Sequence, residues 1–220
     1  MEIIYEDNHI VIVNKAAGEI VQGDKTGDKP VVEMVKEYLK EKYKKPGNVF
    51  CGVVHRIDRP VAGLVILAKT SKALSRLNEM LRKGEIHKSY LALVEGKPIM
   101  ESDTIDNYLV SNGKINKTFL SDDSNPEAKK SILEYSTVKS GERYTLLSIN
   151  LLTGRKHQIR AQLSSIGHPI KGDLKYGAKR SNPDGGISLQ SASLSFIHPV
   201  SKVPLHFQAP PLPDFKPFID

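Results

Sequence analysis

Residues 55–70, His-Arg-Ile-Asp-Arg-Pro-Val-Ala-Gly-Leu-Val-Ile-Leu-Ala-Lys-Thr, constrain the fold of this chain most strongly. The apolar run at 64–68 has the length and β-branched content of a buried strand. Just before it stands a single acid, Asp58. An unpaired buried carboxylate costs several kcal/mol. Asp58 therefore either closes a turn through backbone hydrogen bonds or is held there for chemistry, and the flanking cations Arg56 and Arg59 favour an ionised carboxylate.

The remaining composition excludes several classes of protein. No apolar run approaches the roughly 20 residues that span a membrane, and the N-terminus lacks the basic and apolar regions of a secretory signal. Cys51 is the only cysteine, which excludes an internal disulfide and a thiolate metal cluster. We expect a cytoplasmic protein that does not associate with membranes.

The chain is basic, with a net charge of +7, and its lysines are clustered. Residues 36–45 alone contain five of them. A surplus of this kind indicates a polyanionic partner that is bound through its phosphates, although a basic surface can also serve solubility alone.

Hydrophobic periodicity predicts an α+β fold, with a mixed, mainly antiparallel sheet and flanking helices. Helices are expected from Pro30 to Lys45, from an N-cap at Ser71 to Gly84, and over 157–166. Residues 100–127 give no clear pattern. Strands are expected at 3–5, 10–13, 64–68, 90–94, 132–138, 144–152, 187–196 and 203–207.

Three polar segments, 55–58, 88–90 and 153–160, stand at the ends of predicted elements. They could bring together one acid, one phenol and two arginines: Asp58, Tyr90, Arg155 and Arg160. Taken singly, Tyr90 also fits core packing and Arg160 a surface ion pair. The chain lacks a second carboxylate for paired-acid hydrolysis, a nucleophile elbow and a phosphate-binding loop, and the spacing of His157 and His168 favours hydrogen bonding over metal binding.

These segments, in this order, resemble the signature motifs of the RluA-type pseudouridine synthases. The resemblance includes residues 88–96, Lys-Ser-Tyr-Leu-Ala-Leu-Val-Glu-Gly, and 153–160, Thr-Gly-Arg-Lys-His-Gln-Ile-Arg. It continues through Gly-His-Pro-Ile-Lys-Gly-Asp at 167–173, and the opening strands match as well. It therefore covers the chain essentially from end to end.

The family converts uridine in RNA to pseudouridine without cofactor or metal, and the resemblance assigns roles by position. It implies that Asp58 is the catalytic carboxylate, that Tyr90 stacks on the target base, and that Arg160 pairs with the aspartate, with Arg155 the lesser candidate. Arg56 would enter the RNA stack when the base leaves. Further RNA contacts are expected from His55, Arg59, Arg155, His157, Lys69 and Lys88.

The resemblance also implies a single catalytic domain, 1–220, with a central RNA-binding cleft and without the small N-terminal RNA-binding domain of the S4 type. We expect a monomer that acts on ribosomal RNA or tRNA. Two motifs depart from the family. Val61-Ala62-Gly63 replaces the usual Thr/Ser-Gly, and Lys15-Ala16-Ala17-Gly18 replaces Lys-Pro-Ala-Gly.

Two alternatives stay open. One is an RNA-binding module that keeps the scaffold without catalysis. The other is a basic glycoside or nucleoside hydrolase, which the lack of a second acid disfavours. Within the leading hypothesis, Asp58 could attack C1′ or remove a 2′ proton.

Overall fold

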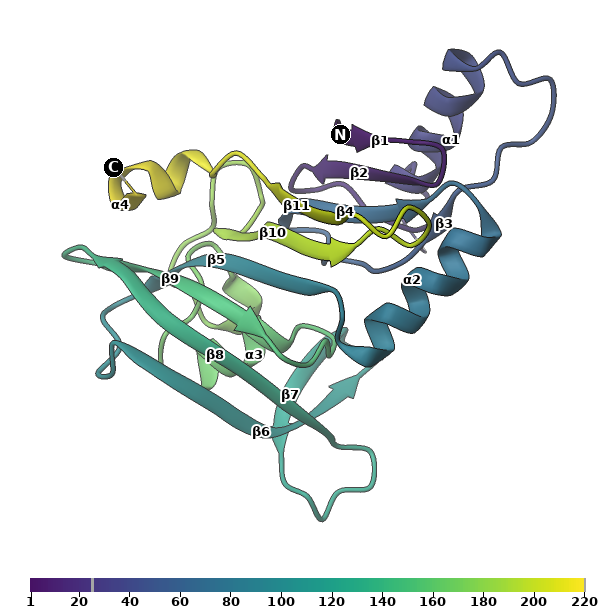
Figure 1. Cartoon of the computed structure of the whole chain (residues 1–220). Helices are drawn as coiled ribbons and strands as arrows, with labels where there is room; N and C mark the ends of the chain where they lie inside the picture. The colour runs from purple at the N-terminus through teal and green to yellow at the C-terminus, as the bar shows by residue number, and fades with distance from the viewer. Residues whose placement is uncertain (25, 220) are drawn as a thin grey trace. The chain divides into compact units, whose positions relative to one another are not determined.

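The computed structural model describes residues 1–24 and 26–219. The chain forms two compact units and passes between them three times (Figure 1). The first unit contains Met1–His87 and Ser191–Ala209, and the second contains Lys88–Gln190 and the chain from Pro210 onward.

A sheet with mainly antiparallel pairing forms the first unit. The strand order is β1 (Glu2–Glu6), β2 (Ile10–Lys15), β4 (Ala62–Ala68) and β10 (Leu189–Ile197), with β3 (Gly52–Val53) paired to β4 and β11 (Pro204–Gln208) paired to β10. β4 is the strand that the apolar run predicted. It is buried along its whole length and aligns Gly63 with Lys15 and Ala68 with Ile10.

Helix α2 (Ser71–Lys83) covers one face of this sheet. Its Leu77 and Met80 pack against alternate residues of β2 and β4, including Ile12 and Ile66. The N-cap is Thr70, whose hydroxyl accepts the Ala73 N–H at 3.1 Å, so the prediction of Ser71 as the N-cap was wrong by one residue. Thr70 keeps extended backbone, which a cap requires, whereas Ser71 is already helical.

Helix α1 (Val31–Lys42) also belongs to the first unit and buries Val31, Val35 and Leu39. Pro30 precedes it as the N-cap, and the helix ends three residues before Lys45, the end expected from the sequence. The expected helix and its register are therefore confirmed, with a shorter C-terminal end.

The second unit is built on a second antiparallel run of strands. The order is β5 (His87–Glu95), β9 (Tyr144–Leu151), β8 (Lys129–Ser140), β6 (Ser102–Asn112) and β7 (Lys117–Ser121). Residues 100–127, for which hydrophobic periodicity made no prediction, supply the β6–β7 hairpin. Helix α3 (Gln158–Ser165) packs on this unit through Gln162, whose amide donates to the carbonyls of Ile105 and Ser131.

The chain ends in a 3-10 turn (Pro213–Phe215) and a short helix, α4 (Lys216–Ile219), with Phe215 buried against Leu93 and Leu146. The predicted α+β class with mainly antiparallel pairing is confirmed. Among the described residues, no helix has the length and apolar character needed to span a membrane.

Candidate functional site

Asp58 lies on the loop that enters β4. The Val61 N–H donates to the Asp58 carbonyl at 3.0 Å, so residues 58–61 form the predicted turn. The Asp58 side chain is half-buried, while Arg56 and Arg59 are exposed. A turn at residues 58–61 is therefore compatible with the prediction that the Asp58 carboxylate is reactive.

His55 anchors this loop to the sheet. The imidazole is buried, and its Nε2 accepts the Ile66 N–H of β4 at 3.1 Å. A nitrogen that accepts a backbone N–H carries no proton of its own. We therefore interpret His55 as a positioning residue, and its expected contact with RNA stays a prediction.

Lys15 is fully buried at the end of β2 and ties two loops together. Its Nζ donates to the carbonyls of Ala16 and Glu19 at 2.8 Å each and to that of Arg59 at 3.2 Å. Burial lowers the pKa of Lys15 to about 8, and the nearby carboxylates of Glu19 and Asp58 oppose this shift. A lysine that ends an apolar strand was visible in the sequence, but we had not assigned it to the site.

Gly63 closes the same region. Its φ of +115° is rare for residues with a side chain, and a Cβ at this position would lie 2.3 Å from the Ser191 carbonyl oxygen. The Ser191 hydroxyl also donates to the Leu64 carbonyl at 3.1 Å. Glycine is therefore needed both for the backbone conformation and for the close approach of β10.

Tyr90 and Lys88 lie on β5 in the second unit. Tyr90 is buried, 6% exposed, and faces Ile149 of β9 in the strand register. Lys88 is half-buried, and burial lowers its pKa. A Cβ at Gly154 would lie 3.9 Å from Lys88 Nζ, so two of the three polar segments are neighbours within this unit.

Arg160 on α3 is held by a carboxylate that we had not predicted as a site residue. Its Nε and an Nη donate to the two Asp173 oxygens at 2.7 and 2.9 Å, and both side chains are buried. The guanidinium carbon also lies 4.9 Å from the centroid of the Tyr176 ring. This bidentate pairing fixes the plane of the guanidinium. In the sequence, Asp173 was visible only as the end of the 167–173 motif.

His157 and Arg155 flank this arrangement. His157 is buried with a φ of +52°, and its Nδ1 lies 2.9 Å from the Tyr176 hydroxyl, which accepts the Thr118 N–H. The contact with Tyr176 gives His157 a positioning role, and its expected contact with RNA stays a prediction. Arg155 is exposed and donates through Nε to the Lys130 carbonyl at 3.0 Å, so it stays a proposed RNA contact.

Lys69 follows the opposite end of β4 from the Asp58 turn. Its Nζ contacts the Glu6 carboxylate at 2.6 Å and the Asp7 carbonyl at 2.5 Å. It therefore belongs to a different cluster of charged residues from the one around Asp58.

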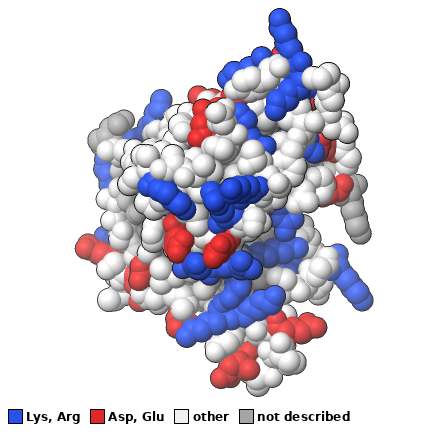
Figure 2. Space-filling view, turned by 45° about the vertical axis from the view of Figure 1, so that its right-hand side comes forward, with Lys and Arg blue, Asp and Glu red and all other residues white. Residues whose placement is uncertain are grey.

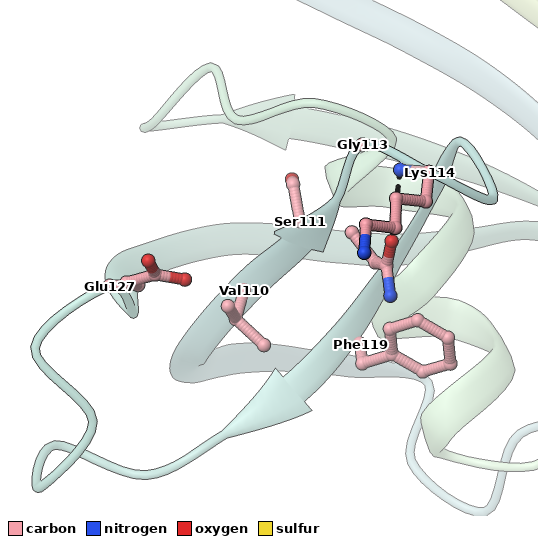
Figure 3. Close-up of a pocket in the computed structure, with 7 residues that line it drawn as sticks. Val110, Ser111, Gly113, Lys114, Phe119 and Glu127 are labelled. Atoms are coloured by element: carbon pink, nitrogen blue, oxygen red, sulfur yellow. Dashed lines mark hydrogen bonds between the residues drawn. The ribbon is translucent and has the colours of Figure 1, made fainter.

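An open hollow of about 530 Å³ lies on the β6–β7 hairpin (Figure 3). It is lined by Val110, Ser111, Asn112, Gly113, Lys114, Phe119 and Glu127, none of which was predicted for the site. Among the described residues, no three His, Cys, Asp or Glu side chains form a group that could hold a metal ion.

The model of a known family, described as RNA pseudouridylate synthase, matches residues 9–165. The chain belongs to this family. The matched range includes Asp58, Tyr90 and Arg160, whereas Asp173 lies beyond it.

Relatives of known name agree with the family match. The chain is 33% identical over 216 residues to the ribosomal large subunit pseudouridine synthase C of Buchnera aphidicola, covering 94% of this chain and 66% of that protein. It is 32% identical over 231 residues to the tRNA pseudouridine synthase C of Pectobacterium carotovorum, covering 95% of this chain and 58% of that protein. The chain thus spans less than two thirds of the length of these relatives.

A solved structure confirms the fold. The chain matches human RNA Pseudouridylate Synthase Domain Containing 4 with a TM-score of 0.81 at 20% identity, covering 98% of this chain and 90% of that chain. The resemblance read from the motifs is therefore confirmed for the family and the fold. The roles of individual residues stay predictions.

Proposed function

We propose that this protein is an RNA pseudouridine synthase, which isomerises specific uridines in structured ribosomal or transfer RNA. The observation that carries the proposal is the family match over 9–165, with Asp58 on a loop that Lys15 and His55 fix in place. The names of the relatives, which include ribosomal and tRNA synthases, support both classes of substrate.

In the proposed mechanism the target uridine first leaves the RNA stack, which costs a few kcal/mol. Stacking on an aromatic ring returns about 1–3 kcal/mol, and we assign this role to Tyr90. Asp58 then acts at the sugar, either attacking C1′ or removing a 2′ proton as the C1′–N1 bond breaks. The freed uracil turns and C5 bonds to C1′, while the Asp58–C1′ bond breaks or the abstracted proton returns to C2′; N1 takes up a proton and C5 loses one.

The guanidinium of Arg160 has the role of stabilising the negative charge of the catalytic carboxylate. Its bidentate bond to Asp173 supports this role, because a guanidinium of fixed plane presents its remaining N–H donors in one direction. The exposed side chains of Arg56 and Arg59 support their proposed contacts with RNA, and Lys88 is a further proposed contact. We propose that Arg56 fills the place of the flipped base.

Replacement of Asp58 by asparagine tests the proposal. Asp58→Asn keeps the size of the side chain and removes its charge. We expect the rate of pseudouridine formation, measured by chromatography of nucleosides from digested RNA, to fall by about 10²–10⁴-fold. The affinity for RNA should stay within about threefold of wild type, because a phosphate-dominated interface does not depend on one carboxylate.

Asp103→Asn is the matched control, since Asp103 is exposed and its carboxylate accepts the N–H of the adjacent Thr104. It should leave both rate and affinity unchanged. Full activity of Asp58→Asn would refute the assigned role. A wild-type protein that binds RNA and forms no pseudouridine would instead be a catalytically silent RNA-binding module.

A further inference from the structure

A second group of charged residues lies in the first unit, at the C-terminal end of α1. Residues 40–45 contain four lysines and one glutamate, and all six are exposed. Blue Lys and Arg side chains project at the top of Figure 2, the height at which Figure 1 draws α1 and the turn after it. We call Lys40, Lys42, Lys44 and Lys45, with Tyr43 and Lys69, the α1 lysine cluster.

A buried carboxylate holds this cluster in place. The Glu6 carboxylate accepts hydrogen bonds from Lys42 and Tyr43 at 2.7 Å each and from Lys69 at 2.6 Å. Burial acts to raise the pKa of Glu6, but the hydrogen bonds outweigh it and lower this pKa to about 2. The end of α1 is therefore fixed to β1 by a carboxylate that is charged at neutral pH.

An exposed aromatic ring gathers the ammonium groups. Tyr43 is 47% exposed, and the Nζ atoms of Lys69, Lys42 and Lys45 lie 4.9, 5.5 and 5.9 Å from its ring centroid. Three cations thus surround one partly exposed ring. Cationic side chains interleaved with an exposed aromatic are typical of surfaces that bind nucleic acid.

Lys44 occupies a backbone position that favours glycine. Its φ is +49°, and the Lys45 N–H donates to the Lys40 carbonyl at 3.0 Å across it, as in a Schellman turn. The left-handed conformation costs free energy for any residue with a side chain. The chain therefore carries a cation where the fold alone would favour glycine.

We propose that the α1 lysine cluster binds the sugar–phosphate backbone of the substrate RNA at a distance from the target uridine. This inference rests on the proposed function. The five lysines of the cluster outnumber its two carboxylates, Glu6 and Glu41, which gives a complementary charge for RNA. The anchor at Glu6 fixes the end of the helix that carries four of them. Gly63 and Lys69 are six residues apart along β4, which places the cluster roughly 20 Å from the start of that strand. An RNA stem-loop whose loop uridine lies at Asp58 would be long enough for its stem to contact the cluster.

Lys44→Gly distinguishes a loss of RNA binding from a loss of stability. It removes the positive charge, and it replaces a residue that is unfavourable in the left-handed backbone conformation by one that is favourable there. The probe is a fluorescently labelled RNA hairpin of about 30 nucleotides with uridines in its loop, titrated at several salt concentrations. We expect Kd to rise about three- to tenfold and the slope of log Kd against log salt to fall by about 0.7–1. The melting temperature should stay unchanged or rise. The triple variant Lys40→Ala, Lys44→Gly, Lys45→Ala should lower the slope by about 2–3.

Lys202→Gly is the matched control. Lys202 is an exposed lysine with a φ of +63°, in the turn between β10 and β11. Its replacement by glycine therefore removes one positive charge from a left-handed backbone position, as Lys44→Gly does. Its Kd should stay within about twofold of wild type, as expected for a site outside the interface.

Wild-type Kd and salt slope in both cluster variants would overturn the inference, as would an equal loss of affinity in Lys202→Gly. So would variants that lose binding to phosphatidylserine vesicles and keep their affinity for RNA. If the cluster variants lose RNA binding while the wild-type protein forms no pseudouridine, the inference stands and the proposed function fails.

Discussion

Lys15 is the residue that connects the start of the chain to the loop that carries Asp58. Three backbone carbonyls accept its ammonium hydrogens, and one of them, Arg59, is adjacent to Asp58. The Gly18 N–H donates to the same Arg59 carbonyl at 2.8 Å. A buried lysine therefore positions the proposed catalytic carboxylate through the backbone.

The titration of Lys15 gives a testable dependence of stability on pH. Burial lowers its pKa to about 8 from the ordinary value of 10.5. Between these values the unfolded chain binds more protons than the folded one, so this group makes the free energy of unfolding rise with pH. The free energy of unfolding of wild type minus that of Lys15→Met should therefore rise by about 2–3 kcal/mol from pH 7.5 to pH 10.5.

Denaturant titrations of both proteins at matched pH check this, and other titrating groups cancel in the difference. A difference that stays constant would show that the three carbonyls offset the effect of burial on this pKa, and one that falls as the pH rises would show that they outweigh it.

At this scale the sequence identified charged residues better than their partners. The turn at Asp58 followed from local pattern, because an acid two residues before a proline needs no distant contact to explain it. The pair between Arg160 and Asp173 could not be predicted from local pattern, because it depends on the path of the chain between α3 and Asp173. The burial of His55 and His157 was missed for the same reason: each bonds a group distant in the sequence.

Among the elements, β4 places the Asp58 loop, and its start depends on one glycine. Gly63→Ala adds a Cβ where φ is +115° and the Ser191 carbonyl lies 2.3 Å away. A conformational penalty and a backbone clash act together. We expect the free energy of unfolding, measured with denaturant, to fall by about 3 kcal/mol or more.

Gly113→Ala in the β6–β7 turn is the control, because a Cβ there meets no atom within 4 Å. It should change stability by less than about 1 kcal/mol. Equal stabilities of the two alanine variants would show that β4 and β10 separate at little cost.

Hydrophobic periodicity predicted the elements that are buried along one face or along their whole length. β4 and α2 were found because their apolar residues follow the strand and helix periods. The β6–β7 hairpin was not, because only Ile105 and Leu109 of β6 are buried and the rest of that strand is partly or fully exposed. Two buried residues in a strand of eleven are too few to establish a strand period in the sequence.

For the whole molecule, the family and the fold followed from motifs in a fixed order, and both are confirmed. Asp58 belongs to the first unit and Tyr90 and Arg160 belong to the second, so the proposal gives each unit a part in the reaction. The basic charge of the chain, +7 overall, belongs to this scale as well, since phosphate contacts act largely independently of the reacting base.

The central claim is that this chain moves the glycosidic bond of uridine from N1 to C5 with Asp58 as the catalytic carboxylate. RNA carrying tritium at C5 of uridine tests it most directly, because each C5–C1′ bond that forms releases one tritium to water. We predict that the wild-type protein releases tritium in step with pseudouridine and yields no free uracil, and that Asp58→Asn releases almost none. Tritium release by Asp58→Asn at the wild-type rate, or free uracil from the wild-type protein, would contradict the account.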